Sequence, residues 1–367
     1  MPGPLEFRAS LIQAADEDAL REQLVRERRT DGLPVILPTP ERVEAMLQAA
    51  AFAGLGRDIV LGEVGPNLGE ATIEKVAINA VMAGCLPEHL PVVIAAMQAL
   101  CDPRLDTTEV QVTTHQIAPL LIVNGPAVKE AGLASGFGAL GYGHRANLSI
   151  GRAVRLCLIN LGGGWPGMSD MSLLGQPGMI SYCLGEAEDD SPFPPLHTTL
   201  GFAADASAVT VTSVGSPHSV QAVLTGDVAS DAERLLELLA HTIGGMGNNN
   251  AGTASGTIIA CLNPDHARAL HRAGLTRQDI QAELARRAGN PAGVLQRLRY
   301  GRTVEDPRPD RARHRRSGAG AGGGGGGPGL LFRRDDALGR RPPPQHLRHQ
   351  GNRFLRRLRS PRGGPLT

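Results

Sequence analysis

The stretch EVQVTTHQIAPLLIVNGP, residues 109–126, decides the fold class of this sequence. Its first half alternates polar and apolar residues, and its second half contains the continuously apolar run PLLIV. This pattern predicts extended structure from Glu109 to Val123. A continuously apolar run is typical of a strand that is covered on both faces. The Asn-Gly-Pro that follows predicts the turn that ends the strand.

Apolar residues repeat at helical spacing on both sides of this strand, and further short apolar runs follow it. We expect helices over 14–29, 41–52, 70–83, 87–100, 147–161 and 231–242, from Pro264 and from Arg277, and strands over 179–184, 208–214 and 257–262. Gly84 is placed to end the third helix, and Thr276 to cap the last one. Strands that alternate with helices predict an α/β protein with a mostly parallel sheet covered by helices.

Composition limits the kinds of protein that this chain can be. With 367 residues, 41% of them hydrophobic, the chain can build a sizeable core. No apolar run reaches the roughly 18 residues that span a bilayer, and the N-terminus lacks the pattern of a signal peptide. The five cysteines are odd in number and contain no CxxC, which favours reduced thiols in the cytoplasm over disulfides or a structural zinc site.

The charge of the chain is divided unevenly. Residues 311–367 contain 14 arginines and two acidic residues, which leaves 23 basic and 34 acidic residues in 1–310, a net charge of −11. An acidic body of this kind argues against nucleic acid as a partner.

We expect three parts along the chain: an N-terminal helical arm (1–32), an α/β domain (33–310) whose two lobes divide near 165–178, and a basic tail rich in Gly, Pro and Arg (311–367). From Ala312 onward the tail contains no Val, Ile, Lys, Glu, Cys or Met. One interpretation is a disordered tail that binds nucleic acid or a membrane surface. The other, which we favour, is translation of GC-rich coding sequence in a shifted frame. With permitted codon choices, a one-base shift reads PPPQHLRHQGN (342–352) as PPLNTCVTKAI, which restores Val, Ile, Lys and Cys.

Cys85 is the first candidate for chemistry. It lies between two predicted helices, just before Pro87, where the second helix is expected to begin. Unpaired backbone N–H groups and the positive end of the helix dipole would favour the reactive thiolate there. His89, one turn further on, is a candidate acid/base partner. The alternative is a small buried cysteine at a helix junction.

Polar residues of the preceding helix add to this candidate site. Lys75 and Asn79 are four residues apart, so they share a helix face. Lys75 is one of two lysines in an arginine-rich chain, which favours a specific role. The alternative is an exposed lysine that forms a salt bridge.

The predicted strand and the loop that follows it supply further candidates. His115 and Asn124 lie at opposite ends of the strand, and strand ends are where sites form in α/β proteins. The glycine-rich loop SGFGALGYGHR (135–145) precedes a predicted helix, an arrangement that can hold an anion on backbone amides. Its spacing matches neither GxGxxG nor the P-loop. The alternatives are a core histidine and glycines that only permit tight turns.

Side chains at the end of this loop suggest a small anionic ligand. His144, Arg145 and Asn147 could bind a carboxylate or a phosphate, and the arginine guanidinium is suited to bind such a group with two parallel hydrogen bonds.

The segment GQPGMISYCLGEAEDDSPFPPLH (175–197) gives one more candidate, Gln176, for substrate binding. Glu186, Glu188 and His197 could bind a metal, but no HxxE or HExxH spacing supports this. We favour a solvated acidic loop, and we therefore expect no metal site.

The motifs EATIEKVAINAVMAGCLPEHLPVV, TTHQIAPLLIVNGP, RANLSIGRAVRLCLIN, GQPGMISYCLGEAEDDSPFPPLH and GNNNAG resemble a bacterial family associated with UGSC-type (seleno)proteins. Members are loosely labelled thiol-disulfide oxidoreductases. The resemblance covers about Leu33 to Asp306. It places Cys85 at the AGC position of the family and puts His115 and Asn124 in matching motifs. Family members continue with an ending similar to NTCVTKAI, which agrees with the shifted frame.

Three functions follow as hypotheses. The first is a thiol-dependent, oxidoreductase-like enzyme that acts on a small anionic substrate through Cys85, with no cofactor indicated. The second is a lyase or hydratase of small carboxylates that uses His and Arg. The third is a non-catalytic subunit that works with a UGSC-type partner. A homo-oligomer is compatible with all three.

Overall fold

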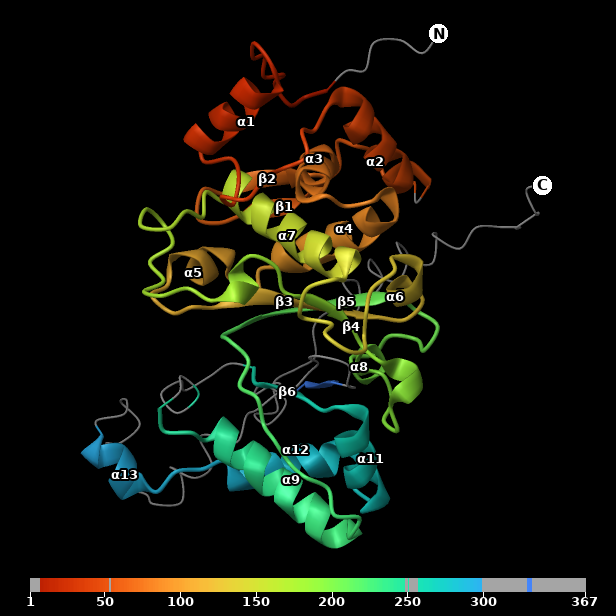
Figure 1. Ribbon diagram of the computed structural model, residues 1–367, viewed down its shortest axis with the longest axis vertical. Coiled ribbons are helices and arrows are strands. Elements are labelled where there is room, and N and C mark those ends of the chain that lie inside the picture. Colours follow the sequence, from red (N-terminus) through yellow and green to blue (C-terminus); the bar gives the residue numbers. More distant parts are fainter. Residues whose placement is uncertain (1–6, 53, 248–249, 251–256, 299–328, 332–367) are drawn as a thin grey trace, which may run out of the picture.

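The computed structural model describes residues 7–52, 54–247, 250, 257–298 and 329–331 (Figure 1). The helices are α1 (Glu17–Arg26), α2 (Pro40–Phe52), α3 (Ile73–Ala83), α4 (Leu90–Leu100), α5 (Thr107–Val112), α6 (Ala127–Glu130), α7 (Arg145–Asn160), α8 (Leu196–Thr199), α9 (Val228–Ile243), α11 (Pro264–Arg272), α12 (Arg277–Arg287) and α13 (Ala292–Arg297). The strands are β1 (Val60–Val64), β2 (Gly69–Thr72), β3 (Ala118–Asn124), β4 (Cys183–Gly185), β5 (Ala208–Val214), β6 (Ile259–Cys261) and β7 (Gly329–Leu331). Short 3₁₀ helices span Pro87–His89, Pro177–Met179 and Glu188–Asp190.

β3 is the central strand of a three-stranded sheet with the order β4-β3-β5. All seven of its residues are buried. Leu121 and Val123 pack into the core formed with the helices, whereas Leu120 and Ile122 pack into a second cluster on the opposite face. This two-sided burial explains the continuous apolar run in the sequence and confirms a covered strand.

The mixed helical and sheet structure agrees with an α/β protein, but a mostly parallel sheet is not confirmed. Among the described strands, β3 and β4 form the one parallel pair. β5 runs antiparallel to β3 along its whole length, and the pairs β1–β2 and β6–β7 are also antiparallel. The sequence pattern of a buried strand is the same for both directions, so it left the direction open.

The prediction of extended structure over the first part of the stretch 109–126 is wrong. Residues Thr107–Val112 form α5, because the Asp106 side chain accepts a hydrogen bond from the Glu109 N–H and caps the helix. Gln111, from the same turn, buries its amide and donates to the Gly65 carbonyl. Four alternating residues are too few to distinguish a strand from one helical turn.

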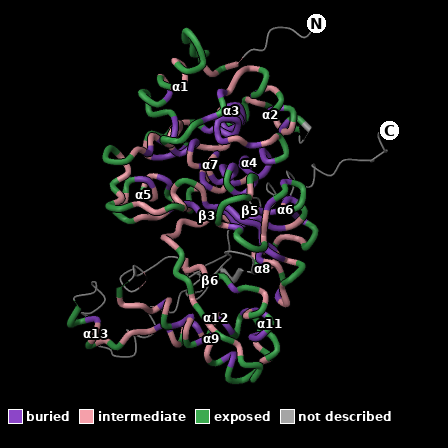
Figure 2. The backbone as a smooth tube through the Cα atoms, viewed as in Figure 1, coloured by how far each residue is buried: buried purple, intermediate pink, exposed green. Residues whose placement is uncertain are grey.

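Helices α4 and α7 cover one face of the sheet, and α3 and α2 pack on the outer side of these two helices (Figure 1). The Thr72 side chain caps α3 by accepting from the Lys75 N–H, and Gly84 ends it at φ +89°, as its position in the sequence predicted. Figure 2 shows α3 as buried over almost its whole length. This helix therefore lies at the centre of the hydrophobic cluster that it forms with α2, α4 and α7.

A separate helical group, α9, α11 and α12, has its own hydrophobic cluster (Figures 1 and 2). Its helices begin at side-chain caps: Asp227 for α9, Asn263 for α11, and Thr276 with Asp279 in a capping box for α12. Apart from Phe193, the cluster draws its buried residues from Ala232 onward. The division into two lobes near 165–178 stays a prediction.

The two ends of the chain are described in part. In the arm, Leu24 of α1 is buried, and Asp31 forms a two-pronged ion pair with Arg152. In the tail, β7 pairs with β6. The other residues of 311–367, and with them the expected disorder and shifted frame, lie outside the described residues. No described helix is both long and apolar enough to cross a membrane.

The glycine that follows β3 provides a test of this packing. Gly125 has φ +74°, and an added Cβ would lie 2.2 Å from the Ala206 carbonyl oxygen. Gly132 has φ +63° with open space around it. We expect Gly132→Ala to cost about 1 kcal/mol of backbone strain and Gly125→Ala to cost roughly 2 kcal/mol more from overpacking. Urea unfolding measures both, and equal losses would contradict the close approach of residues 125 and 206.

Candidate functional site

Polar side chains meet at the carboxyl ends of the parallel strands β3 and β4. Asn124 is the last residue of β3, and Glu186 directly follows β4. Because the two strands run in the same direction, these residues lie at the same edge of the sheet. Ligand sites of α/β proteins form at such edges.

The Asn124 amide holds two carboxylates. Its Nδ2 donates to Glu186 Oε2 at 2.5 Å and to Glu188 Oε1 at 2.8 Å. Backbone groups complete the arrangement, because the Gly125 N–H donates to Glu188 Oε1 at 2.7 Å and the Leu196 N–H donates to Glu186 Oε2 at 2.8 Å. The two carboxylates are thereby fixed side by side.

The environments of the two carboxylates differ. The Glu186 side chain is fully buried, whereas the Glu188 side chain is 22% exposed. Burial raises the pKa of Glu186, although hydrogen bonds from Leu196 and Asn124 and the charge of Arg277 oppose this. Arg277 Nη2 lies 3.8 Å from Glu186 Oε1 and donates to the Pro194 carbonyl at 2.6 Å. A carboxyl group in this position retains its proton to a higher pH than a free glutamate.

His197 completes the group. Its side chain is fully buried, and its Nδ1 lies 3.8 Å from Glu188 Oε1. Within the described part of the chain, neither ring nitrogen has a hydrogen-bond partner. Buried polar groups are normally paired. Both nitrogens of this ring can therefore still form a hydrogen bond with a bound molecule. We call Asn124, Glu186, Glu188, His197 and Arg277 the acid–base cluster.

The sequence identified this cluster only in part. Asn124 was a candidate, and it lies at the end of β3 as expected. The prediction that this segment is a solvated acidic loop is wrong for Glu186 and His197, because both side chains are buried. Arg277 was recognised only as the start of a helix, because no local signal shows that it packs against a loop some 80 residues earlier. No group of three His, Cys, Asp or Glu side chains suited to a metal ion occurs among the described residues.

The region of Cys85 differs from the expectation in its electrostatics. The buried Cys85 Sγ donates to the Ser149 carbonyl at 3.3 Å. Burial raises the pKa of this thiol to about 12, which outweighs the lowering effects of Ser149 and Arg145. A depressed pKa at Cys85 is therefore not found, and the physical reason is the burial of the thiol. The helix N-terminus expected next to Cys85 also differs, because the next segment begins as a short 3₁₀ helix and His89 Nδ1 accepts the Leu86 N–H at 3.1 Å.

The structure does bring His89 and Arg145 close to Cys85. His89 Nδ1 lies 3.2 Å from the Ser149 hydroxyl, and Arg145 donates to the Gly84 carbonyl. Burial lowers the pKa of His89 and favours its neutral form. These contacts hold the junction between α3 and α7 together.

The other candidates of the α3 region and the glycine-rich loop make contacts within the fold. Lys75 Nζ donates to the Glu70 carbonyl, and Asn79 lies between the Lys75 carbonyl and the Asn160 amide. The Asn147 side chain bonds both backbone groups of Ala134 and the Ala139 carbonyl, so it shapes the glycine-rich loop.

The remaining candidates are spread over separate loops. His144 Nε2 lies 3.0 Å from the Phe137 carbonyl on the same loop. The His115 side chain is exposed. It lies in the segment before β3, which begins at Ala118, and not at the end of the strand. Gln176 caps a 3₁₀ helix by accepting from the Gly178 N–H. The structure therefore does not gather the sequence candidates into one site.

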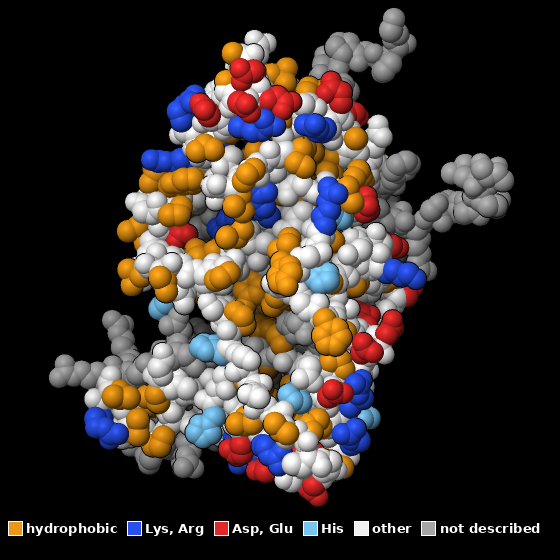
Figure 3. All heavy atoms as spheres, viewed as in Figure 1, with side chains coloured by type: hydrophobic (Ala, Val, Ile, Leu, Met, Phe, Trp, Pro, Cys, Tyr) orange, Lys and Arg blue, Asp and Glu red, His pale blue; other side chains and the backbone are white. Residues whose placement is uncertain are grey.

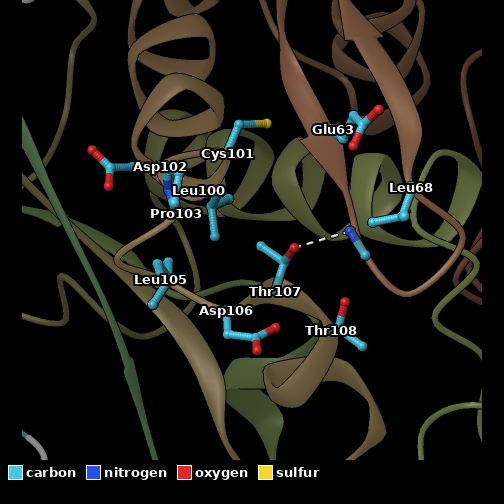
Figure 4. A pocket seen from close by; sticks show the side chains of 11 residues that line it. Glu63, Leu68, Leu100, Cys101, Asp102, Pro103, Leu105, Asp106, Thr107 and Thr108 are labelled. Atoms are coloured by element: carbon cyan, nitrogen blue, oxygen red, sulfur yellow. Dashed lines mark hydrogen bonds between the residues drawn. The ribbon is translucent and has the colours of Figure 1, made fainter.

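A cavity of about 300 Å³ lies elsewhere, between β1, α4 and α5 (Figure 4). Two of its three acidic lining residues have structural roles: Asp106 caps α5, and Asp102 forms an ion pair with Arg104. Figure 4 shows the Thr107 hydroxyl bonded to the backbone at Gly65. None of the sequence candidates lines this cavity, so we assign it no function.

Comparison with family models, curated proteins and solved structures finds no match to this chain. The resemblance to the UGSC-associated family therefore stays a prediction, and the cluster has to be interpreted from its own geometry.

The state of Cys85 can be measured directly. We expect slow alkylation of Cys85 in the native protein between pH 7 and 9, because its apparent pKa is well above the free-thiol value of about 8.5. In denaturant it should react like a free thiol. A limiting alkylating reagent and peptide mass spectrometry give the rate at each pH. Rapid native labelling of Cys85 would contradict a buried neutral thiol.

The ionisation of Glu186 can be tested through stability. Because its pKa is raised in the folded state, the stability that Glu186 contributes is complete below its unfolded pKa of about 4.3 and is lost as the pH rises through the folded pKa. We expect Glu186→Gln to be more stable relative to wild type at pH 8 than at pH 4. Urea unfolding at both pH values measures this difference. A difference that is constant with pH would show that Glu186 has an ordinary pKa.

Proposed function

We propose that this protein is an enzyme of acid–base chemistry, of the lyase or hydratase type, which acts on a small carboxylate at the acid–base cluster. The observation that supports this most directly is His197, a fully buried imidazole with two unpaired nitrogens beside Glu188. This is the second of the three functions suggested by the sequence, but it uses a different set of residues.

Three side chains of the cluster take part in proton transfer. Glu188 is fixed by Asn124 and Gly125 and lies next to His197, so it can orient the imidazole. His197 then removes a proton from a substrate carbon. Glu186 supplies a proton to the leaving hydroxyl group, which departs as water and leaves a carbon–carbon double bond in the product. Burial raises the pKa of Glu186, which suits this carboxyl group to donate a proton.

A carboxylate substrate fits the charges of the cluster. The guanidinium of Arg277 lies 3.8 Å from Glu186 Oε1, so the cluster contains a positive charge as well as carboxyl groups. A guanidinium favours a carboxylate among small ligands.

The cluster is closed in this structure. Asn124 and His197 are fully buried, and Glu188 is the member that reaches solvent. A substrate can reach His197 only if part of the chain around the cluster moves outward. Closure over the substrate would exclude water, which strengthens the electrostatic interactions inside.

The thiol-dependent hypothesis stays a prediction with less support. Cys85 is buried, its S–H is already donated, and its pKa is raised. No contact of the described residues favours a role as a subunit for a UGSC-type partner, and this also stays a prediction.

Proton exchange tests the proposal without knowledge of the substrate. We would incubate the full chain in D₂O with pooled small carboxylic, hydroxy and unsaturated acids and follow their C–H signals by NMR. We expect loss of C–H signal or interconversion of acids for at least one member. Glu188→Gln and His197→Gln should slow this reaction by about 10²–10⁴-fold, the usual contribution of a general acid or base.

Cys85→Ser is the matched control, since Cys85 lies outside the cluster. It should leave the rate nearly unchanged, and thermal melts should show that all variants fold. If Cys85→Ser lost the activity and Glu188→Gln kept it, the reaction would depend on the thiol, and the proposal would be wrong.

A further inference from the structure

Two arginines of α7, three residues apart, have different surroundings. Arg152 donates to both carboxylate oxygens of Asp31, at 2.7 and 2.8 Å. Arg155 uses its Nε to donate to the Met179 carbonyl at 2.5 Å. Its two terminal nitrogens have no hydrogen bond or ion pair with any described residue.

The cation of Arg155 lacks a close counter-ion. Its side chain is only partly exposed. Burial lowers the pKa of Arg155, while the carboxylates of Asp170 and Asp31 oppose this from a distance. The Asp31 carboxylate is already engaged by Arg152. A partly buried cation without a close counter-ion attracts an added anion more strongly than an exposed one does, so this position favours an anion.

A second donor without an acceptor lies against the same turn. Gln176 Oε1 accepts from the Gly178 N–H at 2.9 Å, which orients the side chain. Its buried Nε2 has no acceptor in the described part of the chain. Met179, which accepts from Arg155, is the last residue of this turn. The turn therefore presents a guanidinium and an amide that both need acceptors.

Apolar side chains stand next to these donors. The segment 166–175, which leads into Gln176, exposes Met168 (65%), Met171 (49%), Leu173 (90%) and Leu174 (89%). Figure 3 shows basic side chains over α7 that are set back behind hydrophobic ones. Such exposed apolar groups in a loop are typical of binding surfaces.

We infer that Arg155 and Gln176 form a binding site for a small organic anion, one that carries a carboxylate group and an apolar chain. The two terminal nitrogens of the guanidinium match the two oxygens of a carboxylate. The Gln176 amide gives a third donor, and the Met and Leu side chains of 166–175 cover the apolar chain.

This site is separate from the acid–base cluster. Arg155 bonds Met179, which precedes β4, whereas Glu186 follows β4. The two sites therefore lie at opposite ends of one strand. The inference does not depend on the proposed function.

Binding of defined anions tests the site. We would titrate the full chain with hexanoate, acetate and inorganic phosphate by calorimetry at millimolar concentrations. We expect hexanoate to bind at least about tenfold more tightly than acetate, because several methylene groups leave water. Phosphate that binds more tightly than hexanoate would overturn the carboxylate and apolar character of the ligand.

Variants then locate the binding. Gln176→Glu keeps an acceptor for the Gly178 N–H but puts a negative charge in place of the amide, and Arg155→Met removes the cation. Each should weaken hexanoate binding about tenfold or more. Arg26→Gln removes an exposed arginine of α1 and should change nothing. Absence of hexanoate binding to wild type, or unchanged binding in folded Gln176→Glu, would overturn the inference.

Discussion

The complete burial of β3 is the constraint on which the rest of the structure depends. Helices α4 and α7 cover one face, the cluster around β4 and α8 covers the other, and both strand edges are paired. The strand ends in Asn124, whose amide has no access to water. A buried N–H group favours acceptors within the protein. Glu186 and Glu188 accept from the Asn124 Nδ2, so the packing of the strand draws two carboxylates towards the interior.

Buried carboxylates require compensation in turn, and this compensation joins the two halves of the described chain. Glu186 Oε2 accepts hydrogen bonds from the Asn124 side chain and from the Leu196 N–H. Arg277, the first residue of α12 in the second helical group, lies 3.8 Å from Glu186 Oε1. The Arg277 guanidinium also bonds the Pro194 carbonyl, and Phe193 stacks edge-on against His271. The loop after β4 is thus both a wall of the acid–base cluster and the contact with the second helical group. Movement of that loop would alter both.

Local signals in the sequence predicted the elements better than their arrangement. Gly84, Pro264 and Thr276 mark helix ends through backbone and capping preferences that act within one turn, and the structure has helices that end or begin there. The antiparallel direction of β5 left no such mark, because the burial pattern of a strand does not depend on its direction. The acidic run after β4 was interpreted as solvated for a similar reason: its burial is decided by Asn124 and Arg277, which are distant in sequence.

The pairing of polar atoms distinguishes several of the candidate residues from one another. Cys85, Asn79 and Asn147 were reasonable candidates by residue type, yet each has its side-chain polar atoms engaged by neighbouring backbone or side chains, and His89 Nδ1 accepts the Leu86 N–H. Groups of this kind stabilise the fold, and a ligand would have to break an existing bond to reach them. His197 and the Gln176 Nε2 atom are buried, and Arg155 is partly exposed, while donors or acceptors of all three remain unused in the described part of the chain. Because leaving a buried polar group unpaired costs free energy, a bound molecule that supplies the missing partner recovers it, and these are the positions where binding is most favourable.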